Sequence, residues 1–191
     1  MHGAVTLINN TYMSATTSLP FSFPPSLSPY NISPAEYLSA NSSLTHLVTS
    51  ALITHNSRVL LIQRAAHDGF PLKWECPGGC VEMTDTTILH ALSREVAEET
   101  GLLVQHVSEV VDTLEFDGSK ETRWRKMTFL VALDGAQAPL VRLDTQGPEF
   151  EHVDAVWVSE ADVVVGRCEG REIEFAYHAQ RQTVLDVLRR A

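Results

Sequence analysis

The hydrophobic pattern of the chain becomes regular at about residue 45. From there, runs rich in β-branched and aromatic residues are separated by turn residues, and this alternation predicts strands. The first two runs are separated by His55-Asn56-Ser57, a composition typical of a hairpin turn. The runs expected to form strands are residues 47–54, 59–63, 74–76, 104–116, 123–133 and 152–159.

Three other segments have helical features. Residues 87–100 have the period of an amphipathic helix, and Gly101 follows as a stop signal. Ser159 can cap a short helix through Val165, and residues 172–190 are expected to form a closing helix. Strands, a helix, more strands and then helices predict a mixed sheet between helices rather than a strictly alternating doubly wound fold.

The first 44 residues have a different composition, rich in Ser, Thr, Asn and Pro. This composition predicts a mobile or loosely docked extension over residues 1–44, followed by a folded domain over residues 45–191. Deletion of the extension is then expected to leave the melting temperature near normal. The alternative is that part of the segment packs on the domain. It rests on four aromatic side chains: Phe21, Phe23, Tyr30 and Tyr37.

The charge balance limits the partners. Asp and Glu number 24 against 14 Lys and Arg, for a formal net charge of −10, which argues against sequence-independent binding of nucleic acid. There is no apolar run of spanning length, so no membrane partner is expected. No basic residue precedes Arg58, so neither a secretory signal nor an arginine-rich transit peptide is recognisable, and a cytoplasmic location is expected. The oligomeric state is not indicated.

The predicted helix after residue 87 carries an unusual group of acids. At 100° per residue, Ile88 and Val96 fall on the core-facing stripe, Glu95 and Glu99 at its edge, and Glu98 one step further round. Like charges at this spacing repel, and acids in the last turn face the negative end of the helix dipole. A solvated acidic face is the ordinary interpretation of such a cluster. The position at the edge of the core favours instead a hard divalent cation, Mg²⁺ or Mn²⁺.

A nine-residue segment that begins in this helix and ends just beyond it resembles the second half of the Nudix box, G-x5-E-x7-R-E-U-x-E-E-x-G-U, where U is apolar. It matches at every fixed position and reads Arg94-Glu95-Val96-Ala97-Glu98-Glu99-Thr100-Gly101-Leu102. The first half, Gly79-x5-Asp85, departs twice: Asp85 replaces a glutamate, and eight residues instead of seven precede Arg94. The resemblance covers roughly residues 46–190, with flanking elements that include Glu151-His152 and Trp157-Val158.

The resemblance implies an α/β/α sandwich with a mixed β-sheet and a loop–helix–loop catalytic motif. Glu95, Glu98 and Glu99 would bind the metal, helped by a backbone carbonyl of Gly78 or Gly79. The implied activity is Mg²⁺-dependent hydrolysis (or Mn²⁺-dependent) of a small-molecule diphosphate, in which a nucleoside diphosphate is linked to another moiety.

The resemblance also implies roles for residues around the metal. Arg94 would orient Glu95 by a charge-assisted hydrogen bond. One acid from a later loop, Glu149 or Glu151, would act as a further ligand or as the general base.

Substrate contacts are expected from four other residues, each with an ordinary alternative. Arg64 ends a strand that points toward the box and could meet a phosphate, and Trp74 could stack on a base or belong to the core. Arg125 and Lys126 belong to the densest basic stretch, which could equally be a charged hairpin. The histidines have no partner pattern and are expected to have no role; they include His67, His90 and His152.

Two other functions stay open. A non-nucleotide substrate such as an isoprenyl diphosphate would use the same carboxylates. A catalytically silent Nudix-fold binding module would typically have lost them, so their presence argues against it.

Overall fold

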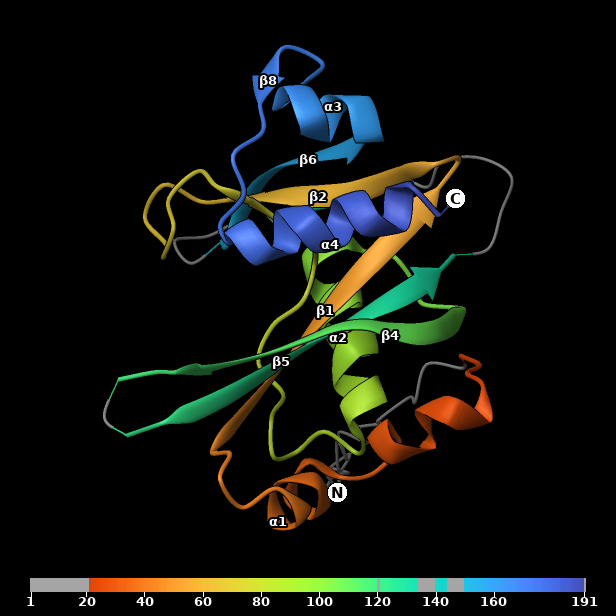
Figure 1. The fold of residues 1–191 in the computed structure, drawn as a ribbon, viewed down its shortest axis with the longest axis vertical. Helices are drawn as coiled ribbons and strands as arrows, with labels where there is room; N and C mark the ends of the chain where they lie inside the picture. Colours follow the sequence, from red (N-terminus) through yellow and green to blue (C-terminus); the bar gives the residue numbers. More distant parts are fainter. Residues whose placement is uncertain (1–20, 120, 134–139, 144–149, 191) are drawn as a thin grey trace, which may run out of the picture.

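A computed structural model describes residues 21–119, 121–133, 140–143 and 150–190. A mixed β-sheet lies between helices on its two faces (Figure 1). Helix α2 (Ile88–Thr100) packs on one face, and helix α4 (His178–Leu188) covers the other. This arrangement confirms the predicted α/β/α sandwich.

Five of the six strands occur in the order β3-β2-β1-β5-β4, and the sixth, β6, pairs with the other edge of β2. Only β1 and β5 run parallel; the other pairs are antiparallel. Because the sheet contains both parallel and antiparallel strand pairs, it is mixed, as the order of elements predicts. The strands are β1 (His46–His55), β2 (Arg58–Arg64), β3 (Trp74–Glu75), β4 (His106–Asp117), β5 (Arg123–Ala132) and β6 (His152–Val158).

Strands β1 and β2 pair only next to their hairpin turn, at Thr54↔Val59 and His55↔Arg58. Further along β1, the loop after β3 takes the place of β2. The backbone N–H of Thr49 donates to the carbonyl of Gly79 at 2.9 Å, and that of Ala51 donates to Pro77 at 2.7 Å. This pairing holds the Pro-Gly-Gly turn against the centre of the sheet, next to α2.

The helix ends follow the sequence signals in two cases and differ in the third. Helix α2 begins after Thr87, whose side chain accepts from the N–H of His90, and ends at Gly101 in the left-handed conformation. Helix α3 (Glu160–Val165) begins with a capping box at Ser159. Helix α4 begins only at His178, because the residues predicted to start it belong partly to a small hairpin of β7 (Arg167–Cys168) and β8 (Arg171–Glu172). No helix in the described part of the chain is long and apolar enough to cross a membrane.

The segment of residues 21–44 packs against the domain, which corrects the predicted mobile extension for these residues. Leu27 and Tyr37 are buried in the same core as α2. Two short helices carry them, η1 (Pro25–Tyr30) and α1 (Pro34–Ala40), and each begins with a proline at its first position. The prolines therefore start helices here instead of preventing structure. The rest of the predicted extension, residues 1–20, lies outside the described residues.

Candidate functional site

The last two turns of α2 bring their carboxylates against the Pro-Gly-Gly turn. The N–H of Gly78 donates to Glu99 Oε2 at 2.6 Å. A Cβ on Gly79 would lie 2.6 Å from Glu95 Oε2, and one on Gly78 would lie 2.2 Å from the carbonyl oxygen of Thr49. Gly78 therefore lets the turn lie directly against the backbone of β1, and a side chain at Gly79 would displace the carboxylate of Glu95.

The three box glutamates differ in exposure as the helical wheel predicts. The exposed fraction of the side chain is 58% for Glu98, 13% for Glu95 and 9% for Glu99. Burial raises the pKa of Glu95 to about 6, although Arg94 opposes the shift. Burial also holds the pKa of Glu99 well above its ordinary value, and neighbouring carboxylates add to that effect. Few neighbouring groups offset the cost of burying the negative charge of these carboxylates. Their oxygens therefore suit a hard divalent cation.

Arg94 holds the acidic cluster in place from the solvent side. Its Nη1 lies 2.9 Å from both Glu95 Oε1 and Glu98 Oε2, and its Nε and Nη2 each lie 3.0 Å from an oxygen of Asp85. Burial acts to raise the pKa of Asp85, but hydrogen bonds from Arg94 and from the N–H of Glu82 keep it below the ordinary value. Asp85 therefore anchors Arg94, although its side chain is shorter than that of the usual glutamate and one extra residue separates it from Arg94.

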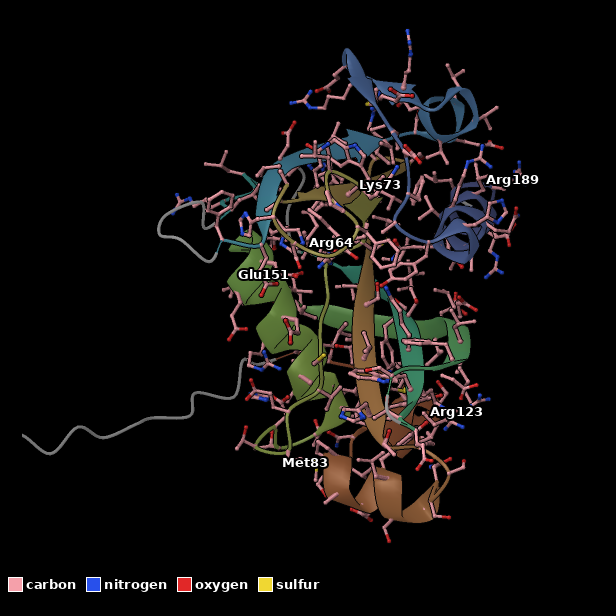
Figure 2. All side chains as sticks on the ribbon, turned by 90° about the vertical axis from the view of Figure 1, so that its left-hand side faces the viewer. Arg64, Lys73, Met83, Arg123, Glu151 and Arg189 are labelled. Atoms are coloured by element: carbon pink, nitrogen blue, oxygen red, sulfur yellow. The ribbon has the colours of Figure 1, made fainter. Side chains whose placement is uncertain are left out.

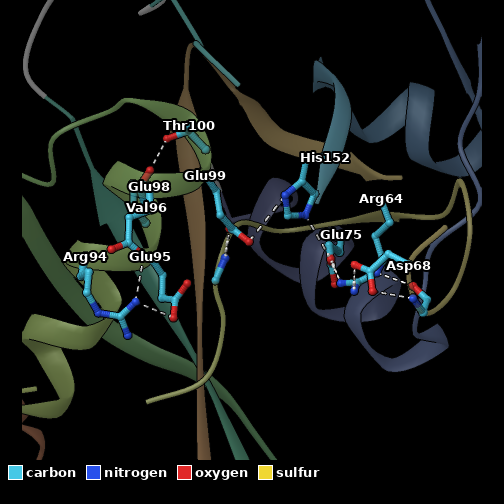
Figure 3. A network of polar contacts seen from close by, with 12 residues as sticks. Arg64, Asp68, Glu75, Arg94, Glu95, Val96, Glu98, Glu99, Thr100 and His152 are labelled. Carbon is cyan, nitrogen blue, oxygen red and sulfur yellow. Dashed lines mark hydrogen bonds and ion pairs between the residues drawn. The ribbon is translucent and has the colours of Figure 1, made fainter. Parts of the chain in front are cut away.

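His152, for which no role was expected, lies between two carboxylates (Figure 3). Its Nδ1 is 3.7 Å from Glu99 Oε1, and its Nε2 is 3.4 Å from Glu75 Oε1. Glu151, next to it on the chain, is exposed beside the end of α2 (Figure 2). Ligand atoms of Glu99, Glu151 and His152 all lie within 4.8 Å of one another. The other candidate from this loop, Glu149, lies outside the described residues.

Glu75 is a second residue that sequence reasoning missed. It is only 4% exposed, and it forms an ion pair with Arg64, which also pairs with Asp68. Burial acts to raise the pKa of Glu75, but His152, Arg64 and Lys126 together lower it. Arg64, the predicted phosphate contact, is thus already neutralised by two carboxylates. In this structure its guanidinium stabilises the buried charge of Glu75.

Two predicted substrate contacts are placed elsewhere by the structure. Trp74 is 1% exposed in the core beneath α4, and its indole N–H donates to the carbonyl of Glu172, so it has no free face for a base. The guanidinium of Arg125 donates to Glu115, and to the Tyr37 hydroxyl at 2.9 Å. Arg125 therefore ties α1 to the β4–β5 hairpin.

Lys126 stays a candidate for a substrate contact. Its Nζ lies 4.9 Å from the ring centroid of Tyr177, on the side of the sheet that α4 covers. Both residues line a cavity of about 60 Å³ next to the start of α4. The other lining residues are Asp112, Leu114, Phe116, Thr128, Ala179 and Gln180.

Comparison with known proteins identifies the family. The model of the NUDIX domain matches residues 44–178, so this chain belongs to the Nudix family, as the box predicts. A curated relative, the RNA pyrophosphohydrolase of Psychrobacter sp. (strain PRwf-1), is 31% identical over 121 residues. The match covers 56% of this chain and 66% of the relative, so the chain spans just under two thirds of that protein.

Solved structures share the fold at lower identity. The MutT NUDIX hydrolase from Burkholderia pseudomallei is 19% identical with a TM-score of 0.55, over 73% of this chain and 95% of that one. The NUDIX domain of Shewanella oneidensis NrtR complexed with ADP ribose is 20% identical with a TM-score of 0.56, over 83% and 99%. An ADP-ribose pyrophosphatase from Streptococcus suis 89-1591 is 24% identical with a TM-score of 0.51, over 75% and 92%.

The stability of the metal-free protein should fall as the pH rises from 5 to 7.5. Because the pKa of Glu95 rises from 4.5 to about 6 on folding, its protonation stabilises the fold fully below pH 4.5, and this contribution is lost as the pH passes 6. After a discount for partial solvation, we expect Glu95 to contribute roughly 1 kcal/mol to the change. Thermal melts in excess chelator measure it.

The matched variants of this experiment are Glu95→Gln and Glu98→Gln. The first should flatten the dependence of melting temperature on pH. The second removes a charge that adds only a smaller part to the raised pKa of Glu95, so it should flatten the dependence less. An equal pH dependence in Glu95→Gln and in the unmodified protein would contradict the assignment of the shift to Glu95.

Proposed function

We propose that this chain is an Mg²⁺- or Mn²⁺-dependent hydrolase that cleaves the diphosphate linkage of a nucleoside diphosphate joined to another moiety. One observation carries the proposal: in a chain of this family, the box carboxylates converge on the glycine turn at the edge of the core. The cytoplasmic location and the lack of a nucleic-acid partner stay predictions.

The residues that would hold the cation are Glu95, Glu98 and Glu99. Of the two glycine carbonyls, that of Gly79 accepts the N–H of Thr49, so the carbonyl of Gly78 is the better candidate ligand. A divalent cation supplies charge neutralisation for the phosphate oxygens and makes a water molecule more acidic.

The chain's own residues have distinct roles in this proposal. Arg94 orients Glu95 and Glu98 through its two 2.9 Å contacts. The exposed carboxylate of Glu151 is the candidate for the late acid that acts as a further metal ligand or accepts the proton of the attacking water, because it lies beside Glu99 and has no side-chain partner among the described residues. Attack is then expected at phosphorus, since attack at carbon would need a nucleophile or an acid beside the organic moiety, and these residues supply only metal ligands and a base for water.

We propose a nucleoside rather than an isoprenyl chain as the organic moiety. The cavity beside Lys126 does not decide between the two, because its volume of about 60 Å³ is far below the roughly 300–1,000 Å³ of typical ligand pockets. Relatives named as an RNA pyrophosphohydrolase and an ADP-ribose pyrophosphatase agree with this choice.

A panel of diphosphates assayed in water labelled with heavy oxygen tests the proposal. Nucleoside diphosphate derivatives and isoprenyl diphosphates are each incubated with Mg²⁺ or Mn²⁺, and products are identified by mass spectrometry. We expect turnover of a nucleoside derivative, with the label in a phosphate product, because attack falls on phosphorus. The metal-free reaction serves as the control.

Each of the other outcomes identifies a different function. Label in the alcohol of an isoprenyl product would contradict attack at phosphorus and favour ionisation of an allylic diphosphate. Binding of a diphosphate without turnover of any compound would favour a silent binding module.

A further inference from the structure

The histidine at the start of β6 has one ring nitrogen without a hydrogen bond to any described residue. His152 is 3% exposed, its Nδ1 lies toward Glu99, and one of its ring nitrogens lies within 4.8 Å of an oxygen of Glu151. The distance of 3.7 Å from Nδ1 to Glu99 Oε1 exceeds a hydrogen bond. A ring nitrogen of a buried histidine that lies near a carboxylate without a hydrogen bond to it can bind a cation through its lone pair.

The other ring nitrogen of His152 faces a carboxylate held in place by its own partner. Nε2 lies 3.4 Å from Glu75 Oε1, and Glu75 is fixed by its ion pair with Arg64 (Figure 3). Histidines that bind metals almost always donate their second N–H to a carboxylate, carbonyl or water, which leaves the first nitrogen with its lone pair free. If Nε2 carries the proton, Nδ1 presents its lone pair toward Glu99.

Strand pairing puts these groups in register. His152 lies opposite Arg64 in the β2–β6 pair, and Glu75 lies opposite Ile62 in the β2–β3 pair. Pairing with β2 therefore places these side chains in a row of successive contacts, from Arg64 to Glu75, then to His152, and then to Glu99 at the end of α2. The position of the imidazole is set by the sheet and does not depend on a loop.

We propose that His152 Nδ1 is a metal ligand, which with Glu99 and Glu151 forms a mixed nitrogen and oxygen site for a first-row transition ion such as Mn²⁺. The inference rests on the proposed function and deepens it. Oxygen-only sites suit Mg²⁺, whereas an imidazole donor favours transition ions. The ratio of the affinity for Mn²⁺ to that for Mg²⁺ should therefore be higher at this site than at a site made of the box carboxylates alone.

Pulsed electron paramagnetic resonance on the full chain loaded with Mn²⁺ detects a directly bound nitrogen. We expect a ¹⁴N coupling in the unmodified protein, at one equivalent of Mn²⁺ and at saturation, and its loss in His152→Gln. The control His55→Gln alters a partly exposed histidine at the end of β1, which packs near Trp157, and should keep the coupling. Calorimetry should show that His152→Gln weakens Mn²⁺ binding by about 10-fold or more and changes Mg²⁺ binding much less.

A second variant separates ligation from packing. Glu75→Gln keeps the imidazole but removes the carboxylate behind it, so the coupling should persist while Mn²⁺ binding weakens by about 10- to 100-fold. Bound Mn²⁺ without a nitrogen coupling in the unmodified protein would overturn the inference, and so would an unchanged coupling in His152→Gln.

The failure of this inference can be told from the failure of the proposed function. If Mn²⁺ binds only oxygen and diphosphate hydrolysis persists, the inference is wrong and the proposed function stands. If neither Mn²⁺ nor Mg²⁺ binds and no diphosphate is hydrolysed, both are wrong.

Discussion

Glu99→Gln should lose metal-dependent turnover by about 10³-fold, the scale on which removal of a group that stabilises transition-state charge acts. The reason is geometric. Glu99 is the most buried of the three box glutamates, and the N–H of Gly78 fixes one of its oxygens, leaving the other directed toward His152 and Glu151. Turnover of a diphosphate in Mg²⁺ or Mn²⁺ measures the effect.

The same variant should be more stable than the unmodified protein when metal is absent. Burial raises the pKa of Glu99, so an ionised carboxylate at this position destabilises the metal-free fold at neutral pH. The amide can still accept the hydrogen bond from Gly78. A higher melting temperature in chelator together with lost turnover would separate the catalytic role from a folding defect.

Two control variants test whether the gain in stability and the loss of turnover are specific to the buried carboxylate of Glu99. Glu98→Gln should also lose turnover, but with little gain in stability, because its side chain is 58% exposed. Glu36→Gln, at an exposed acid in α1, should change neither property. Full turnover by Glu99→Gln, or by the unmodified protein in excess chelator, would contradict the assignment of the site.

The carboxylates of α2 could be placed from sequence because helical periodicity is local. The pattern puts Glu95 and Glu99 at the edge of the core and Glu98 outside it, and the exposed fractions follow that order. The strand runs and the helix ends at Gly101 and Ser159 have similarly local signals.

The residues behind the carboxylates could not be placed in this way. His152 approaches Glu99, and Glu75 approaches His152, only because β6 and β3 both pair with β2. Strand partners far apart in sequence are not encoded in a local pattern. The one available signal for Glu75 is an acid within a short strand between Trp74 and Cys76, which are both buried.

The basic stretch of β5 illustrates another limit. Neighbouring residues of a strand point to opposite faces, so at most one of Arg125 and Lys126 can face a given site. Sequence alone does not say which one. In the structure, Arg125 contacts α1 and Lys126 contacts Tyr177 beside α4.

Composition does not predict the packing of residues 21–44, because it measures only their average polarity. Most of its residues are small and polar, but the few large ones are placed where they can be buried. Leu27 of η1 and Tyr37 of α1 are buried in one core, and Tyr30 packs edge-on against Phe129 of β5 at 5.3 Å between ring centroids. A few well-placed apolar side chains are enough to dock a segment.

Deletion of residues 1–42 should therefore lower the melting temperature by more than about 10 °C, contrary to the expectation from composition. Burial of each large apolar side chain contributes roughly 1.5–3 kcal/mol, and about 1 kcal/mol corresponds to roughly 2–4 °C in a domain of this size. The deletion removes Leu27, Tyr30 and Tyr37 together, exposes the core face that they cover, and removes two partners of Arg125. Thermal melts of the deleted and full chains measure the loss.

Single substitutions in η1 test the same cause without removing the chain. Leu27→Ala should cost about 2–5 kcal/mol, the range for truncation of a buried leucine. The matched change Ser28→Ala, at the next and exposed position of the same helix, should stay within about 0.5 kcal/mol. If the deleted chain and Leu27→Ala both melted near the temperature of the full chain, the contacts of residues 21–44 would add little to stability, and the composition-based boundary at residue 44 would describe the folding unit after all.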